Sequence, residues 1–286
     1  MFRRVCAALA AMAFSGFCAA GAGASAAPAC GETVTLDTHD GTTAKYSLAG
    51  VSAAASNGAT LALVLLPGGG GFVDLDAGGC PRRLKGNSLI RQIAAFHAAG
   101  IATALADAPT DYRGAAGLAG FRIRADHADD IGKVIADVRR RTGLPVWLAG
   151  ASRGTISAAN AAARLSGPAA PDGLVLTSPV TSGFEGGRKA WVAQTVFSTD
   201  LERIRVPVLV VVHAADKCIR TPPRLGPRIV EKTGGSREQA VTVTGGPGWD
   251  GDESVEACKG RAPHGFFSQH EDVAAGIVRF IRGGRY

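Results

Sequence analysis

One segment of the sequence, residues 145–164, restricts the possible folds most strongly. It begins with an apolar run of strand length, Pro145-Val146-Trp147-Leu148-Ala149, and passes directly into Gly150-Ala151-Ser152-Arg153-Gly154. An alanine-rich stretch of helical length follows, from Thr155 to Arg164. A buried strand, a sharp turn and a helix are the context in which the pattern G-x-S-x-G predicts a nucleophilic serine at the turn.

Each residue type in this turn has a physical reason. A strained backbone at Ser152 holds the hydroxyl clear of the sheet, and the flanking glycines let strand and helix pass without side-chain clashes. The backbone N–H of Arg153 at the start of the helix can face an oxyanion. Because the chain has 39 glycines in 286 residues, the pattern can arise by chance and also fits an ordinary strand-to-helix turn. Whether Ser152 is a nucleophile therefore depends on its partner residues.

Strand-length apolar segments alternate with helical patterns through most of the chain. Four continuous apolar runs are typical of strands covered on both faces: residues 61–66, 101–106, 173–177 and 208–212. Helical patterns occupy residues 87–97, 126–141 and 271–282. Residues 33–37 and 45–48 alternate as in an antiparallel pair, and 240–244 as in a last strand. The alternation predicts an α/β fold with a mostly parallel central sheet and helices on both faces.

The N-terminus predicts export. Met1-Phe2-Arg3-Arg4 is followed by an alanine-rich apolar run to about Ala20 and then by Ala24-Ser25-Ala26, a small-x-small cleavage pattern. We therefore expect a signal peptide at residues 1–26 and a single mature domain at residues 27–286, in the periplasm or secreted. The apolar run is short for a stable membrane span, which argues against an N-terminal anchor. No other stretch of the sequence is long and apolar enough to cross a membrane, so no span is expected after cleavage.

Composition argues against several partners. Loss of the leader lowers the basic count from 31 to 29 against 24 acidic residues, which leaves a mature net charge of +5. The basic residues are scattered and are not interleaved with aromatic residues, so we expect no nucleic-acid partner. No C-x-x-C motif or His/Cys cluster has zinc spacing, so no metal and no cofactor are expected. The oligomeric state is left open.

A glycine run follows the apolar segment at residues 61–66. Pro67 leads into Gly68-Gly69-Gly70-Gly71, which fits a flexible turn but also fits a loop that presents bare N–H groups to a substrate carbonyl. Its place directly after an early core strand favours the second interpretation. We expect Gly69 or Gly70, together with Arg153, to form an oxyanion hole.

A serine nucleophile needs a base and an orienting acid, and the chain offers Asp216 and His264 downstream in that order. Asp216 follows the strand at 208–212, and His264 lies in a Pro- and Gly-containing loop before the last helix. Each alone would be an ordinary loop residue. Because the ends of parallel strands converge at one edge of the sheet, Ser152, Asp216 and His264 together predict a catalytic triad.

The cysteines fit this arrangement. Cys6 and Cys18 leave with the leader, and four cysteines remain, an even number suited to an oxidising compartment. Cys218 lies two residues after Asp216, and Cys258 lies six before His264, so a bridge between them would tie the acid loop to the histidine loop. Cys30 and Cys80 are then the remaining pair.

With these residues in place, the sequence resembles the α/β-hydrolase family, and among its members the exported bacterial ones without a large lid. The resemblance spans most of the mature chain and rests on residues 67–71, on residues 150–154, and on Asp216 and His264. The histidine that usually precedes the oxyanion glycines is absent, and Pro67-Gly68 stands in its place. Glu185 is an alternative acid, since some family members carry theirs after the preceding strand.

The resemblance implies hydrolysis of a carboxylic ester, small or polymeric, through an acyl-serine intermediate. The alternatives are a serine peptidase of the same fold and a non-catalytic binding module. A further alternative is a metal site that uses His213, Asp216 or the acidic residues Asp250, Asp252 and Glu253. Four aromatic residues are candidates to line an apolar pocket: Phe72, Trp191, Trp249 and Phe266.

Overall fold

The computed structural model describes residues 1, 30–51, 58–186 and 189–286. Apart from Met1, the predicted signal peptide at residues 1–26 lies outside the described residues. The described part of the chain contains no helix with the length and apolar character that a membrane span requires.

Eight strands form one sheet in the order β1-β2-β4-β3-β5-β6-β7-β8. The strands are β1 (Glu32–Asp37), β2 (Thr43–Ala49), β3 (Leu61–Leu66), β4 (Ile101–Ala106), β5 (Val146–Ala151), β6 (Leu174–Thr177), β7 (Val208–His213) and β8 (Glu238–Val243). β2 pairs antiparallel with both β1 and β4, and all other neighbours are parallel. The predicted mostly parallel sheet with an antiparallel opening pair is confirmed.

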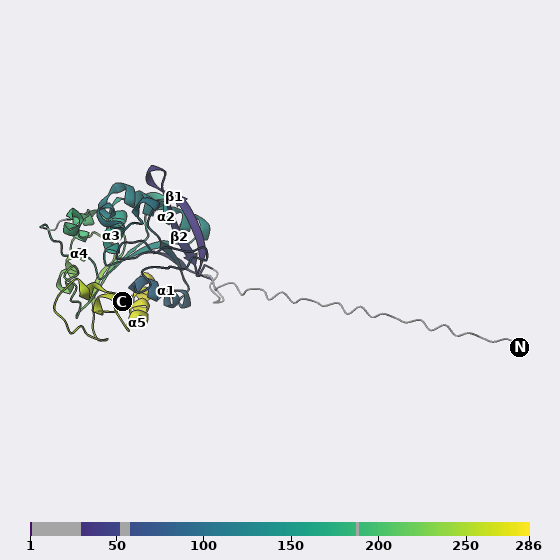
Figure 1. The fold of residues 1–286 in the computed structure, drawn as a ribbon. Helices are drawn as coiled ribbons and strands as arrows, with labels where there is room; N and C mark the ends of the chain where they lie inside the picture. The colour runs from purple at the N-terminus through teal and green to yellow at the C-terminus, as the bar shows by residue number, and fades with distance from the viewer. Residues whose placement is uncertain (2–29, 52–57, 187–188) are drawn as a thin grey trace.

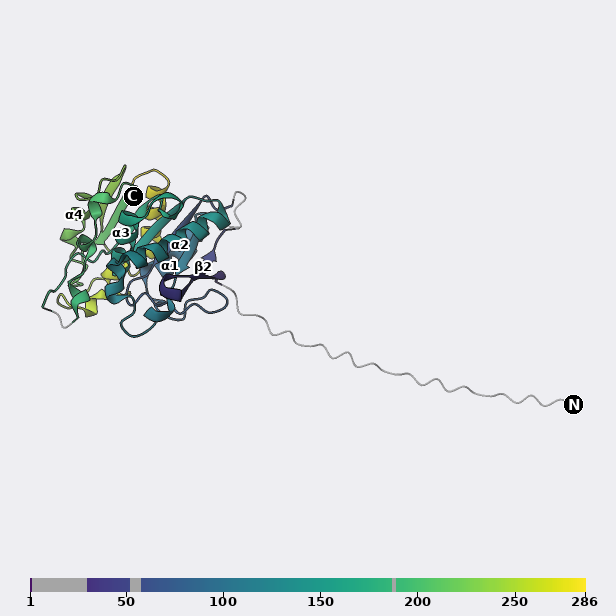
Figure 2. The same ribbon diagram turned by 90° about the horizontal axis from the view of Figure 1, so that it is seen from above.

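Helices cover both faces of this sheet (Figure 1). α1 (Ser88–Ala98) and α5 (His270–Ile281) pack together on one face, and α2 (Ala125–Thr142) and α3 (Gly154–Arg164) pack together on the other. The short helix α4 (Pro227–Val230) contacts β7 and β8 and adds Ile229 to the apolar layer under α2 and α3. Figure 2 shows α2 and α3 lying across the sheet.

The continuously apolar strands follow from this double cover. In β3, Ala62 and Val64 belong to the apolar layer beneath α2 and α3, and Leu63 and Leu65 belong to the layer beneath α1 and α5. Every residue of β3 is buried, so both alternating faces need apolar side chains. The helices differ from these strands, because each helix buries only one side and therefore needs apolar residues on that side alone.

The order of the strands reverses at the point where the site is expected. The chain passes from β3 to β4 on one side of β3 and then returns to β5 on its other side. Leu66 at the end of β3 pairs with Gly150 of β5, so the loops that follow these two strands are neighbours. In open α/β sheets, such a reversal at the carboxyl edge is where ligands bind.

The last strand is longer at its start than its alternating pattern predicts. It begins at Glu238 rather than Ala240, because Glu238 and Gln239 pair in register with Val208 and Leu209 of β7. Backbone pairing with a neighbour extends the strand over residues whose polar side chains give no strand signal.

Candidate active site

The turn between β5 and α3 is a strained elbow with Ser152 at its apex. Ser152 has φ 52°, in the left-handed region that residues other than glycine seldom adopt. Its N–H donates to the carbonyl oxygen of Thr177 on β6 at 3.0 Å. A Cβ added to Gly154 would lie 2.0 Å from the carbonyl oxygen of Leu66, and one added to Gly150 would lie 2.5 Å from that of Gly154. Both glycines are therefore required by close backbone packing.

The glycine run after β3 forms a tight turn directly against Ser152. The N–H of Gly71 donates to the carbonyl oxygen of Gly68 at 3.1 Å, and Gly69 has φ 59°. A Cβ on Gly68 would lie 2.8 Å from the Cβ of Ser152, so only glycine allows this approach. Within the described part of the chain, the N–H groups of Gly69, Gly70 and Arg153 have no hydrogen-bond acceptor.

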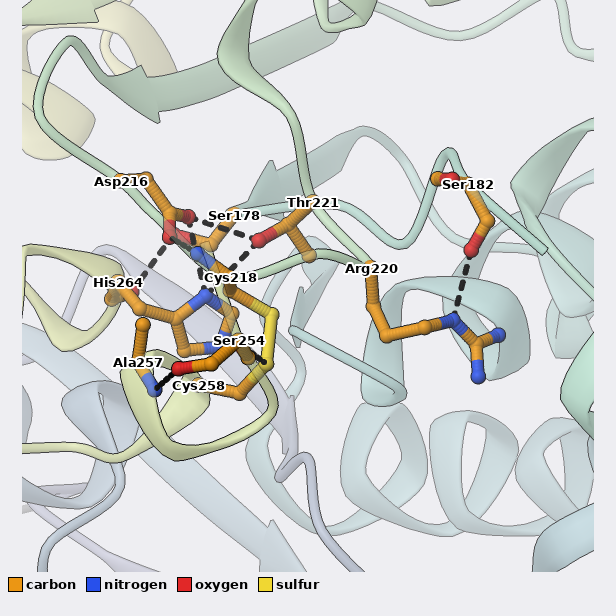
Figure 3. Close-up of a disulfide and its surroundings, with 10 residues drawn as sticks. All are labelled: Ser178, Ser182, Asp216, Cys218, Arg220, Thr221, Ser254, Ala257, Cys258 and His264. Atoms are coloured by element: carbon orange, nitrogen blue, oxygen red, sulfur yellow. Dashed lines mark hydrogen bonds and ion pairs between the residues drawn. A yellow bond between two sulfur atoms is a disulfide. The ribbon is translucent and has the colours of Figure 1, made fainter. Parts of the chain in front are cut away.

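The acid and the imidazole predicted from the sequence lie together in the core. Nδ1 of His264 and Oδ2 of Asp216 are 3.0 Å apart, and both residues are 5% exposed (Figure 3). The backbone N–H of Cys218 donates to Oδ1 of Asp216 at 2.8 Å. Because the carboxylate accepts at Nδ1, the imidazole proton lies on Nδ1, and Nε2 is left as the basic nitrogen.

Two further residues that the sequence did not single out hold this pair. Oγ1 of Thr221 donates to Oδ2 of Asp216 at 2.8 Å and lies 3.0 Å from Nδ1 of His264. Oγ of Ser178 donates to the carbonyl oxygen of His264 at 2.7 Å. Thr221 reaches the carboxylate because its loop folds back, with its own N–H bonded to the carbonyl oxygen of Cys218. A lone threonine gives no sequence signal for such a contact.

Ser152 and His264 line one cavity of about 230 Å³. Its other lining residues include Gly69, Leu84 and Asn87. No hydrogen bond joins Ser152 to His264 among the described residues, so the two side chains share a cavity without direct contact. Catalytic hydrogen bonds are often long before substrate binds and shorten in the complex.

Two disulfides pair the four cysteines in the expected way. Cys218 and Cys258 are bonded beside the Asp216–His264 pair (Figure 3), and Cys258 also lines the cavity. Cys30 and Cys80 form the second pair. The first bridge joins the loop that carries the acid to the loop that carries the histidine.

A buried arginine lies beneath the glycine turn. Arg122 is 1% exposed, and its guanidinium donates to Oγ of Ser157 at 2.7 Å and to the carbonyl oxygen of Gly69 at 3.3 Å. Burial, and then the charge of Arg153, lower the pKa of Arg122 to about 9, so it is still a cation at neutral pH. No carboxylate is within ion-pair distance of it in the described residues.

The remaining candidates from the sequence lie elsewhere. Glu185 is exposed and does not approach His264, whose acid neighbour is Asp216. Nε2 of His213 contacts Oε1 of Gln269 at 2.9 Å. Asp250, Asp252 and Glu253 are exposed. The four aromatic candidates, Phe72, Trp191, Trp249 and Phe266, are not among the residues that line the cavity of Ser152.

One set of potential metal ligands is present but is already engaged. Donor atoms of Asp216, Cys218 and His264 lie within 4.8 Å of one another. The sulfur of Cys218 is in a disulfide, and Asp216 and His264 are bonded to each other. A thiolate is the form of cysteine that binds metal, so this cluster does not provide a three-ligand metal site while the disulfide is intact.

No protein-family model and no curated protein matches the sequence significantly, but solved structures share its fold. Est1E from Butyrivibrio proteoclasticus aligns with a TM-score of 0.57 and 16% identity over 88% of this chain and 98% of its own. Dienelactone hydrolase from Anabaena variabilis gives 0.56 and 16% over 91% and 100%. Puromycin hydrolase gives 0.57 and 13% over 89% of this chain and 39% of its own. The fold is that of the α/β-hydrolases.

Proposed function

We propose that this protein is a serine hydrolase that cleaves carboxylic esters through an acyl-serine intermediate. The observation that carries the proposal is the buried hydrogen bond between Asp216 and His264 beside a cavity that Ser152 also lines. The left-handed backbone of Ser152 is the second support, because strain of this kind persists where surrounding structure and function require it.

The proposed reaction assigns a role to each group. Nε2 of His264 removes the proton of Ser152 as the hydroxyl oxygen attacks the ester carbonyl carbon. Asp216 fixes the tautomer of His264 and stabilises its positive charge, with Thr221 as a further donor to the carboxylate. His264 then protonates the leaving alcohol, and water releases the acid in a second cycle of the same steps.

The oxyanion of the tetrahedral intermediate needs donors that have no other partner. The N–H groups of Gly69, Gly70 and Arg153 meet this condition in the described structure, and Gly69 lines the cavity with Ser152. We propose that Arg153 and one or both glycines form the oxyanion hole. Loss of one such donor typically costs about 3–4 kcal/mol of transition-state stabilisation.

Esters are favoured over peptides by the charge beside the serine. Enzymes that remove N-terminal residues have to bind an ammonium group, which calls for carboxylates near the nucleophile. Here the charged side chain adjacent to Ser152 is Arg153, and its pKa is lowered by burial and by the nearby cation Arg220. Among solved structures with the same fold, one is named a cold-adapted esterase and another puromycin hydrolase.

A panel of substrates with a matched pair of variants tests the proposal. Short and long acyl esters and aminopeptidase substrates are compared with the wild type, Ser152→Ala and Ser166→Ala, the last being an exposed serine just after α3. We expect ester hydrolysis by the wild type and Ser166→Ala and none above background by Ser152→Ala. Cleavage confined to peptide substrates would favour the peptidase, and binding without turnover would favour a binding module.

We also propose that the protein is exported. The two disulfides support an oxidising compartment, because such bonds are rare in the reducing cytosol of ordinary bacteria. Sequencing the N-terminus of protein from the periplasm or medium tests this. A mature chain that begins at Ala27 supports cleavage after Ala26, and a chain that retains Met1 contradicts it.

A further inference from the structure

The side chain of Arg153 lies over an aromatic ring and has no anionic partner among the described residues. Its Cζ lies 5.1 Å from the ring centroid of Trp191, over the face of the indole. Trp191 belongs to a short turn, Ala190–Ala193, in the segment between β6 and β7. Among the described residues, the Arg153 guanidinium makes no hydrogen bond and no ion pair, so its donors remain available.

Arg220 reaches the same turn from the acid loop. Its Nε donates to the carbonyl oxygen of Ser182 at 2.7 Å, and its Nη2 donates to that of Gln194 at 3.0 Å. Gln194 is itself bonded to the carbonyl oxygen of Trp191. Figure 3 shows Arg220 extending away from the Asp216–His264 pair toward Ser182. Two arginines, one beside the serine and one beside the acid, therefore converge on Trp191–Gln194.

This pair of cations is uncompensated within the described structure. Burial, and then the charge of Arg220, lower the pKa of Arg153, and burial lowers the pKa of Arg220. No carboxylate forms an ion pair with either side chain in the described part of the chain. Desolvated charges are normally paired, so two partly buried cations without an anion create a strong preference for one.

We propose that Arg153 and Arg220 form an anion subsite beside Ser152 that binds a carboxylate carried by the ester substrate. The planar guanidinium presents donors in a fork that matches the two oxygens of a carboxylate. All donors of Arg153 and the Nη1 group of Arg220 are free for this purpose among the described contacts. This assignment of a substrate class rests on the proposed ester hydrolysis at Ser152.

The subsite belongs to the acyl part of the substrate. His264 protonates the leaving alcohol, so the alcohol lies toward His264, which lines the cavity of about 230 Å³ together with Ser152. Neither arginine is among the described residues that line this cavity. The acyl chain therefore extends toward Trp191, and the preferred substrates are monoesters of dicarboxylic acids.

Two esters that differ by one charge test the inference. Monomethyl adipate carries a carboxylate, and methyl adipamate replaces it with a neutral amide of nearly the same shape. We expect the wild type to hydrolyse the carboxylate ester with a kcat/KM at least about tenfold higher, which corresponds to one charge-assisted hydrogen bond. Added salt should reduce this ratio.

Variants of single arginines show which side chains cause the preference for the carboxylate ester. In Arg220→Gln and in Arg153→Gln, which keeps the backbone N–H, the ratio should fall toward one. Arg140→Gln removes a charge from an exposed arginine on α2 and should keep the wild-type ratio. A ratio near one in the wild type, or a ratio unchanged in both subsite variants, overturns the inference while hydrolysis that depends on Ser152 still supports the proposed function.

A binding measurement separates the two proposals. Calorimetric titration of folded Ser152→Ala with monomethyl adipate and methyl adipamate does not depend on turnover. Tighter binding of the carboxylate ester, lost when Arg220→Gln is added, supports the subsite. Equal binding of the two compounds refutes the subsite. Absence of turnover in the wild type, with selective binding retained, refutes the hydrolase instead.

Discussion

Arg122 supplies a buried positive charge that orients the glycine turn. It donates to the carbonyl oxygen of Gly69, and because the peptide is trans, the N–H of Gly70 points the opposite way, away from the buried guanidinium. The second hydrogen bond, to Ser157 on α3, ties the turn to the helix that follows Ser152. Arg122 is thus a positioning residue for the proposed oxyanion hole.

Replacing Arg122 should lower turnover more than it weakens substrate binding. Arg122→Met removes both hydrogen bonds, and we expect kcat to fall roughly ten- to a hundredfold with a small change in KM, because a displaced N–H stabilises only the transition state. Arg122→Lys should recover part of the loss. Steady-state kinetics on protein shown to be folded by circular dichroism provides the check, and an unchanged kcat in Arg122→Met would contradict the role.

The residues of the site differ in how readily the sequence predicts them. Ser152 is found because glycines on both sides mark a sharp turn, and Asp216 and His264 are found because each follows a recognisable strand. Thr221 and Arg122 are not found, because their roles come from contacts between segments distant along the chain. Arg122, for example, meets Gly69, which is 53 residues away.

At the scale of elements, the elbow between β5 and α3 depends on a contact with β3. A Cβ on Gly154 would meet the carbonyl oxygen of Leu66 at 2.0 Å. Gly154→Ala should therefore force α3 away from β3 and destabilise the fold by about 1–3 kcal/mol. Gly114 offers a matched control, since an added Cβ there meets no described atom within 4 Å and its φ is not positive.

Urea unfolding of the two alanine variants measures this difference. Gly114→Ala should unfold at or slightly above the wild-type midpoint, because a restricted unfolded chain favours folding. Gly154→Ala should unfold at a clearly lower midpoint with a similar slope. Equal midpoints for the two variants would show that the elbow does not need glycine at this position.

The elements themselves were predictable where burial is complete. The apolar runs at 61–66 and 101–106 coincide with β3 and β4, because both faces of these strands are covered. The segment between β6 and β7 was less predictable. Its short turns are held by tertiary contacts, such as the bond from Arg220 to the carbonyl oxygen of Gln194, which no local pattern reports.

For the whole molecule, the burial of a histidine between α2 and α3 should make the free energy of unfolding depend on pH. His127 is buried between them, with Nε2 2.9 Å from Oγ of Ser157. Burial, followed by the charges of Arg122 and His39, lowers its pKa to about 3. The folded state thus binds this proton more weakly than the unfolded chain, whose histidine has a pKa of about 6.5.

Because the pKa of His127 is lower in the folded state than in the unfolded chain, lowering the pH destabilises the folded state. Neutral His127 makes its full contribution to the free energy of unfolding above about pH 6.5. As the pH falls toward 3, this contribution decreases by about 1.4 kcal/mol per pH unit. His127→Gln should therefore show a flatter decline in unfolding free energy between about pH 6 and pH 4. Denaturant titrations across this range provide the measurement, and the same slope in both proteins would contradict it.

If Ser152 is a nucleophile activated by His264, a fluorophosphonate probe should form a covalent adduct with it. We expect the folded mature protein and Ser166→Ala to be labelled, with mass spectrometry placing the adduct on Ser152. His264→Ala should be labelled far more slowly, and Ser152→Ala should not be labelled. No adduct on the folded wild type, or equal labelling of Ser152→Ala, would contradict a nucleophilic role for Ser152.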